Sequence, residues 1–311
     1  SNGSSANLVI NNPAGVSLSA PLSVSGTVLL NRGSLVTNNY LALQHTASIG
    51  PSATGTFITG NVTIGHYIKG GRRGFRLLGH PFVNSLALDM IKDSIDITGY
   101  GGSINGFTNT TTNQPSAFWY DSLTGNDSLG IDAGWTAFTN TDGSLKNAWK
   151  EFNGIRLLIR GRPGQGLDGT PAGNGSNGTY LPQPVILNLS GQVHTGDQEI
   201  LLHADKYPSY QVIANPYPSS IDLSLVTRNS NVAMNYWVWN PFQATMGGYS
   251  SIPFKSKNIL PAFGAFIVKT NGPAKNTLLF TEHCKVNDIG SDSLPAIYTD
   301  DAYFVELRLE T

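Results

Sequence analysis

Charge is scarce in this chain. Charged residues make up 13% of its 311 residues, about half of the share that is usual in globular proteins, and the formal net charge is −1. This balance leaves no basic footprint for nucleic acid or an anionic membrane, so we expect no nucleic-acid partner. No apolar run approaches the roughly 18 residues that a membrane-crossing helix needs, which argues against direct membrane insertion.

Cysteine and catalytic motifs are scarce as well. A single cysteine, Cys284, excludes an internal disulfide framework. The chain contains neither a Gly-x-Ser-x-Gly elbow nor a His-Glu-x-x-His motif. Cys284 directly follows His283, but neighbouring side chains on a strand point in opposite directions, so we expect a buried structural cysteine. We therefore predict a non-enzymatic protein that needs no cofactor, with calcium as the one open candidate.

Glycine and small polar residues are abundant instead. The chain contains 35 glycines and is rich in Ser, Thr and Asn, whereas Glu and Lys, which build exposed helix faces, are few. This mixture favours strands and turns. We predict an all-β fold with only a few short helices.

The first 66 residues combine short apolar pairs with regularly spaced glycines. Leu41 follows Leu22 by nineteen residues, and Leu35 follows Val16 by the same distance. Short period-two segments separated by turns predict coils of a parallel β-solenoid, with an ordinary β-meander as the alternative. Because each coil buries its apolar face only against a neighbour, the coils need a cap, which we place at residues 56–68.

The larger remainder of the chain reads as a duplication. Residues 76–82 resemble residues 211–217, and the same offset of 135 relates 85–91 to 220–226. The offset then shrinks in order along the chain, which indicates extra loop residues in the first copy. Three further pairs of segments keep this order: 119–121 with 238–240, 154–159 with 264–269, and 184–187 with 277–280.

Four units follow from these patterns: solenoid-like coils at 1–66, a first β-sandwich copy with long loop inserts at 67–203, a second copy at 204–290, and a tail with a terminal strand at 291–311. The duplicated antiparallel region, of sandwich or jelly-roll type, forms either two sandwiches or two halves of one. Short helices are expected at 86–91 and 219–223. We interpret His80 and its counterpart Asn215, which both precede a proline, as polar groups that fix turns.

Segments 60–68 and 72–78 resemble the junction found in large exported proteins of Bacteroidetes-type bacteria, in which Gly-rich β-solenoid coils precede a β-rich domain. Segments 214–222, 236–241 and 262–268 are similar to other recurrent patterns of that family. The resemblance implies an adhesin-like cargo of the type IX secretion system, placed outside the cell or on its surface. The sorting domain of that family is not visible in the chain, and the family has no agreed catalytic residues.

Two groups of oxygen-bearing side chains are candidates for calcium. One lies in a Gly-punctuated loop and the other near the end of the chain: Asp121, Asn126, Asp127 and Asp132, and then Asp288 and Asp292. Calcium takes about six to eight oxygen ligands, which such loops can supply. Neither group has EF-hand spacing, and Asp and Asn are common turn residues for local reasons.

Aromatic residues suggest a surface for carbohydrate or for another partner. Trp119 and Tyr120 in the first copy, with Trp237 and Trp239 in the second, could form a stacking platform. Large aromatics in a β protein are also common core residues. Trp237 and Trp239 alternate, so we expect them on one face of a strand.

Four Asp-Ser-aliphatic triplets are similar to the O-glycosylation acceptor of these bacteria, and their acceptor residues would be Ser94, Ser122, Ser128 and Ser293. Added glycan would solubilise and protect a surface protein.

Our first functional hypothesis is a non-enzymatic extracellular structural or adhesive module of a bacterial cell-surface protein. Its partners would be glycans or proteins of a cell surface or matrix, or copies of itself. One alternative is a self-assembling filament subunit joined through its end strands, with residues 303–309 as a donated strand. The other is a carbohydrate-binding module of a secreted enzyme.

Overall fold

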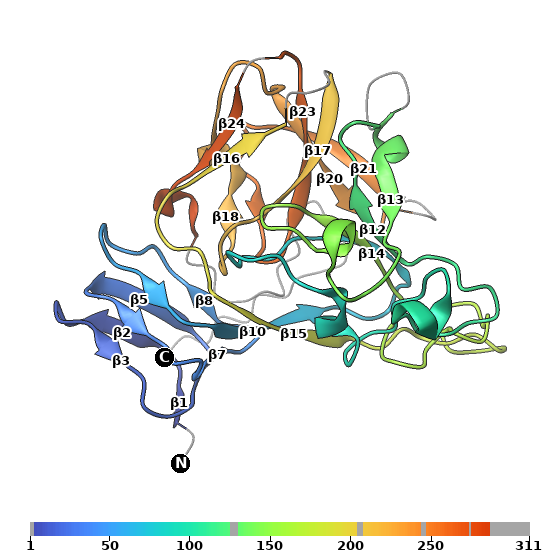
Figure 1. Ribbon diagram of the computed structural model, residues 1–311, viewed down its shortest axis with the longest axis horizontal. Coiled ribbons are helices and arrows are strands. Elements are labelled where there is room, and N and C mark those ends of the chain that lie inside the picture. The colour runs from blue at the N-terminus through green and yellow to red at the C-terminus, as the bar shows by residue number, and fades with distance from the viewer. Residues whose placement is uncertain (1–2, 125–129, 204–207, 244–246, 274, 287–311) are drawn as a thin grey trace, which may run out of the picture.

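The computed structural model describes residues 3–124, 130–203, 208–243, 247–273 and 275–286, and Figure 1 shows their arrangement. Within these ranges the chain forms strands and short 3-10 helices, without an α-helix. A parallel β-solenoid comes first and several antiparallel sheets follow, which confirms the predicted fold class. No helix in the described ranges is long and apolar enough to cross a membrane.

The solenoid has three faces, and each turn of the chain contributes one strand to each face. The first face contains β1 (Gly3–Ser5), β4 (Leu22–Val24) and β7 (Leu41–Leu43). The second contains β2 (Leu8–Asn11), β5 (Thr27–Arg32) and β8 (Ser48–Ile49). The third contains β3 (Val16–Ser17), β6 (Leu35–Val36) and β9 (Ile58–Thr59).

The nineteen-residue spacing is the register of strand pairs on two faces of the solenoid. Leu22 pairs with Leu41 on one face and Val16 with Leu35 on another, both in parallel, which excludes a meander. The apolar residues at these repeated positions face the solenoid interior. Among them, Leu35 and Leu41 are almost completely buried. Burial of each such side chain contributes about 1.5–3 kcal/mol, which is why stacked turns hold together.

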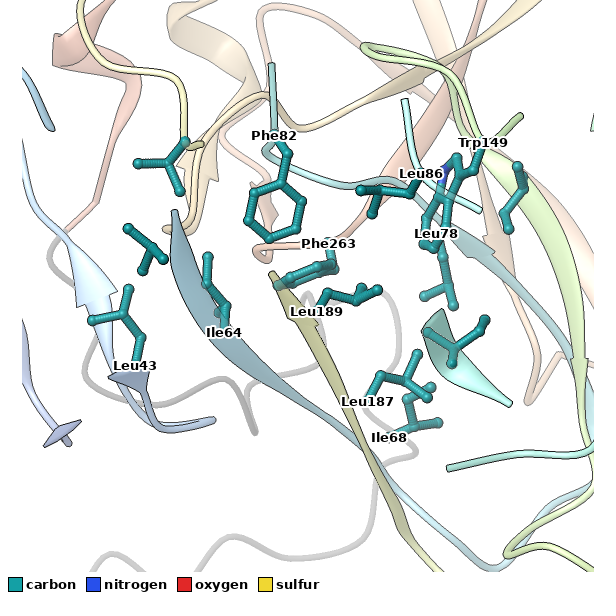
Figure 2. Packing of buried hydrophobic residues seen from close by; sticks show 14 of the residues in the cluster. Leu43, Ile64, Ile68, Leu78, Phe82, Leu86, Trp149, Leu187, Leu189 and Phe263 are labelled. Atoms are coloured by element: carbon teal, nitrogen blue, oxygen red, sulfur yellow. The ribbon is translucent and has the colours of Figure 1, made fainter. Parts of the chain in front are cut away.

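One strand carries the solenoid into the antiparallel region. The first residues of β10 (Val62–Ile68) pair in parallel with β7, while the whole of β10 pairs antiparallel with β15 (Val185–Gly191). The core continues across this junction without a break: Figure 2 shows Leu43 and Ile64 close to Leu189 and Phe82. The predicted cap at 56–68 therefore lies where the fold changes.

The antiparallel region contains two four-stranded sheets with the same strand order. In copy 1 the order is β11 (Gly74–Leu78), β14 (Ile155–Ile159), β12 (Ala117–Tyr120) and β13 (Trp135–Ala137). In copy 2 it is β17 (Ser209–Ala214), β23 (Ala265–Thr270), β20 (Asn235–Asn240) and β21 (Gly248–Pro253). Two small sheets complete copy 2: β16 (Gln198–Leu202) with β24 (Asn276–Phe280) and β19 (Thr227–Arg228), and β18 (Ile221–Asp222) with β22 (Ile259–Leu260).

The predicted helices are single 3-10 turns. η1 (Leu88–Ile91) lies within the first predicted segment, and η5 (Leu223–Leu225) begins near the end of the second. The helix predicted from residue 219 starts late because Ile221 and Asp222 pair with β22 first. Four more turns of this kind are described: η2 (Gly102–Asn105), η3 (Ile131–Gly134), η4 (Leu145–Asn147) and η6 (Glu282–Cys284).

The two four-stranded sheets pack against each other through one shared apolar layer. Leu77 comes from copy 1, while Val212, Ala265 and Ile267 come from copy 2, and aromatic rings surround them. The opposite face of each sheet covers the core of its own copy. The copies therefore meet as two halves joined face to face, which decides a question that the sequence had left open.

Equivalent residues of the two copies touch where their first strands meet. A Cβ atom added at Gly79 would lie 2.3 Å from the Cβ of Ala214, its equivalent. Gly154 faces Ala265 in the same way, at 2.6 Å. Only one methyl group fits at each contact, so one member of each pair is glycine. The pairing also corrects the predicted alignment of 154 with 264 by one residue, because Gly154 occupies the place of Ala265.

The turns at His80 and Asn215 are equivalent in detail. The His80 ring contacts the carbonyl oxygen of Trp149 at 3.0 Å and accepts a hydrogen bond from the Phe82 N–H. The Asn215 side chain accepts from the Tyr217 N–H at 3.0 Å and donates to the carbonyl of Pro261. Both residues are buried and fix a turn, which confirms that interpretation.

Candidate functional site

Two clefts occupy equivalent places in the two copies. The copy-1 cleft is lined by the turn after β12, the segment before β14 and the start of β17, including Trp119, Ser122, Lys146, Lys150 and Gln211. The copy-2 cleft is lined by the turn after β20, the segment before β23 and β11, including Trp239, Pro241, Phe242, Pro261 and Arg76. In each cleft, the first strand of the opposite copy forms one wall.

The backbone around the two clefts is the same. The Asp121 carboxylate accepts a hydrogen bond from the Leu123 N–H at 2.9 Å, and Asn240 accepts from the Phe242 N–H at 2.8 Å. On the other wall, the Asn153 N–H donates to Lys150 and the Gly264 N–H donates to Pro261. Lys150 therefore stands where copy 2 has Pro261, and Leu123 stands where it has Phe242.

The contents of the two clefts differ. The copy-2 cleft has a volume of about 90 Å³, and the guanidinium of Arg76 lies 5.5 Å from the centre of the Phe242 ring. The copy-1 cleft has a volume of about 300 Å³. There Leu123 replaces the ring and Gln211 replaces the arginine. The side chains of copy 2 leave the smaller cleft, and the copy-1 cleft has a size typical of small-ligand sites.

The floor of the copy-1 cleft is held in place by Gln211, a buried residue of β17. Its side-chain oxygen accepts from the His203 N–H, and its side-chain nitrogen donates to the His203 carbonyl, both at 2.9 Å. The two hydrogen bonds fix the backbone at the end of β16 and leave the His203 ring exposed at the cleft.

The structure does not place the four candidate aromatics on one platform. Trp119 lines the copy-1 cleft and packs on the core of copy 1. Tyr120, Trp237 and Trp239 belong to the layer between the two sheets. Trp237 and Trp239 share one face of β20, as predicted, while Tyr236 and Val238 point into the core of copy 2.

A polar chain crosses the layer between the sheets. Trp135 donates to the Tyr249 hydroxyl at 3.1 Å, and that hydroxyl donates to Asp132 at 3.2 Å. Asp132 also pairs with Arg156 at 3.3 Å, and the Arg156 guanidinium lies over the rings of Phe75, Phe118 and Trp135. Burial raises the pKa of Tyr249 and lowers the pKa of Arg156. This network joins the copies.

The described calcium candidates already have protein partners. Asp121 closes its own turn, and Asp132 serves the Arg156 network. In the ranges that the structure describes, no group of three or more His, Cys, Asp or Glu side chains could hold a metal ion. Asn126, Asp127, Asp288 and Asp292 lie outside those ranges.

Two candidate glycosylation sites lie in the described chain. Ser94 is half-buried beside Arg162 and Pro184, and Ser122 is half-buried at the copy-1 cleft. Ser128 and Ser293 lie outside the described residues.

Cys284 is fully buried, and burial raises the pKa of its thiol. It lies in η6 rather than on a strand, because the N–H of Cys284 bonds back to Thr281. Its neighbour His283 is exposed, so the two side chains point apart as expected.

Sequence reasoning missed Lys146, Lys150 and Gln211 in the copy-1 cleft, and of these Lys150 and Gln211 differ from their equivalents. The duplication could have revealed these two differences. In the corrected alignment, Lys150 stands where copy 2 has Pro261, and Gln211 stands where copy 1 has Arg76. In comparisons with protein-family models, curated proteins and solved structures, nothing matched this chain.

Proposed function

We propose that this chain is a non-enzymatic structural and adhesive module that works outside the cell, as part of a bacterial cell-surface protein. The solenoid and the antiparallel region share one sheet and one core, which makes a stiff frame. On that frame copy 1 holds a cleft of about 300 Å³, where copy 2 has one of about 90 Å³. This difference between two equivalent positions is the observation that supports adhesion through the copy-1 cleft.

The frame suits a contact site because strands of both copies form the cleft walls. Val212 on β17 and Ile155 on β14 are buried at its base, so the lining is held by packed sheets. Binding to a preorganised cleft costs little ordering of the protein. The Gly-rich inserts of copy 1 add variable loop surface to the same half of the molecule.

Arrays of glycans and of matrix proteins test this proposal. We expect the purified chain to bind at least one class, and Trp119→Ala to abolish binding while thermal unfolding shows an intact fold. Tyr100→Ala is the matched control, because Tyr100 is exposed and lies outside the cleft lining. A chain that binds no glycan, no matrix protein and no copy of itself would refute adhesion, and cleavage of a bound glycan would refute the non-enzymatic assignment.

Self-assembly is a second candidate, supported by the edge strands of the first described solenoid turn. Among the described strands, β1, β2 and β3 each pair on one side only, and Val9 on β2 is 52% exposed. Such parallel edges can accept another chain. If the chain assembles through them, electron microscopy will show fibres that lengthen with concentration, and the edge charge of Val9→Lys will suppress them. Fibres that persist in Val9→Lys would contradict this route.

A further inference from the structure

The copy-1 cleft carries positive charge in a chain whose net charge is −1. Lys146 and Lys150 are both exposed at its rim, and neither forms an ion pair with another described residue. The one acidic group in the described lining is Asp121, and one of its oxygens is already bound to the Leu123 N–H. The charge of the cleft therefore favours a negatively charged ligand.

The other lining groups match a sugar ring. The half-exposed Trp119 offers an aromatic face on which the C–H face of a pyranose can stack. Ser122 and the exposed Asn153 supply a hydroxyl and an amide, which donate to and accept from sugar hydroxyls. An apolar wall with a few polar groups is the usual composition of a small-ligand site.

The copy-2 cleft has the same backbone turns as the copy-1 cleft but different side chains. Pro261 and Pro241 stand in place of Lys150 and Ser122, and the Phe242 ring lies beneath the Arg76 guanidinium in the cleft lining. Lys150 and Ser122 are therefore not required by the turn or by the strands, because copy 2 builds both without them. Lys146 corresponds to Lys257 of copy 2, which does not line the copy-2 cleft. Lys150 and Ser122 are specific to the copy-1 cleft.

We propose that the copy-1 cleft binds an acidic saccharide, with Trp119 stacked on a sugar ring and Lys146 and Lys150 paired with its carboxylates. This assignment rests on the proposed adhesive function and names its ligand class. An oligosaccharide that carries uronic acids fits the chemistry of this lining, because it offers repeated carboxylates for two lysines and a ring for Trp119.

Titration calorimetry with a uronic-acid tetrasaccharide tests the assignment. The carboxyl-reduced form of the same tetrasaccharide is the neutral probe. We expect binding of the acidic form to weaken about tenfold in the double variant Lys146→Gln/Lys150→Gln, since two exposed ion pairs are lost. Raising the salt concentration will weaken the wild type more than the variant, because exposed ion pairs are screened.

The matched control removes two exposed lysines of copy 2 that do not line the cleft, in Lys255→Gln/Lys257→Gln. It changes the net charge equally and leaves the affinity unchanged. Equal affinity for the acidic and reduced forms, or equal losses in the two double variants, would overturn the acidic ligand while leaving adhesion in place. Failure of the wild type on every array, as described above, would remove adhesion itself.

Discussion

His80 and Asn215 are different residues with one structural role, and they differ in their response to acid. His80 is 1% exposed, and burial lowers its pKa to about 4. In the unfolded chain a histidine has a pKa of about 6.5. Between these values the unfolded chain binds a proton that the folded chain excludes. The stability that His80 contributes is therefore complete above pH 6.5 and is lost as the pH falls towards 4.

The variant His80→Asn places the copy-2 residue in copy 1. We expect a cost of roughly 1–2 kcal/mol at pH 7, because the smaller side chain leaves space beside Trp149. Stability will depend less on pH between 6.5 and 4.5, where His80 accounts for about 2 kcal/mol at pH 5. Urea unfolding across this pH range measures both effects. The exposed His283→Asn is the control, and an unchanged pH slope in His80→Asn would contradict the assignment.

At the scale of elements, the solenoid turns are interchangeable units. β1, β4 and β7 lie in register at intervals of nineteen residues, and on the three faces the strands of each turn pair with those of the neighbouring turns. The stability of such an array is approximately a sum of units and of the interfaces between them. One turn is therefore removable if the register is kept.

Deletion of residues 22–40 tests this property. β7 then takes the place of β4 beside β1, so the apolar residues still point inward. We expect a β-type circular dichroism spectrum, one unfolding transition and a stability lower by ~2–5 kcal/mol. Deletion of residues 22–31 is the control, because it breaks the register and exposes apolar residues. Equal behaviour of the two deletions would show that the turns are not equivalent units.

At the scale of the whole molecule, a buried ion pair fastens copy 2 to the solenoid. The Lys285 Nζ atom lies 2.7 Å from Glu282 and 4.5 Å from the centre of the Tyr217 ring, and it donates to the Gly50 carbonyl at 3.4 Å. Glu282 in turn accepts from the Ser52 N–H at 2.8 Å. Burial lowers the pKa of Lys285, and the carboxylate of Glu282 opposes this shift.

Glu282→Ala leaves this buried ammonium without its partner. We expect a loss of about 3–5 kcal/mol, since an unpaired buried charge is costly. Calorimetry should show one transition in the wild type and a transition at lower temperature in the variant. Glu199→Ala is the control: its pair with Lys275 is exposed, so the loss stays below about 1 kcal/mol. A single unshifted transition in Glu282→Ala would contradict the fastening role.

Local patterns in the sequence were enough to predict the solenoid register, the all-β class and the order of the duplicated segments. The spacing of Leu22 and Leu41 predicts their pairing, because stacked turns repeat the same position in each turn. The turn-fixing role of His80 and Asn215 was also readable, because each precedes a proline at a strand end. The clefts could not be predicted from the sequence, since each is lined by side chains from both copies.

The amino-acid sequence by itself determined which segments are strands and which residues are equivalent, because alternation and repetition are properties of the chain. Tertiary structure alone decided how the copies meet and what remains open between them. Phe152 and Phe263 adopt a left-handed backbone with φ near 60°, against their intrinsic preference, and carry carbonyls that accept from Ala214 and Gly79 of the opposite copy. Contacts of this kind depend on packing between distant segments, and the same packing leaves a small cleft beside Phe242 in copy 2 and a larger one at the equivalent place in copy 1.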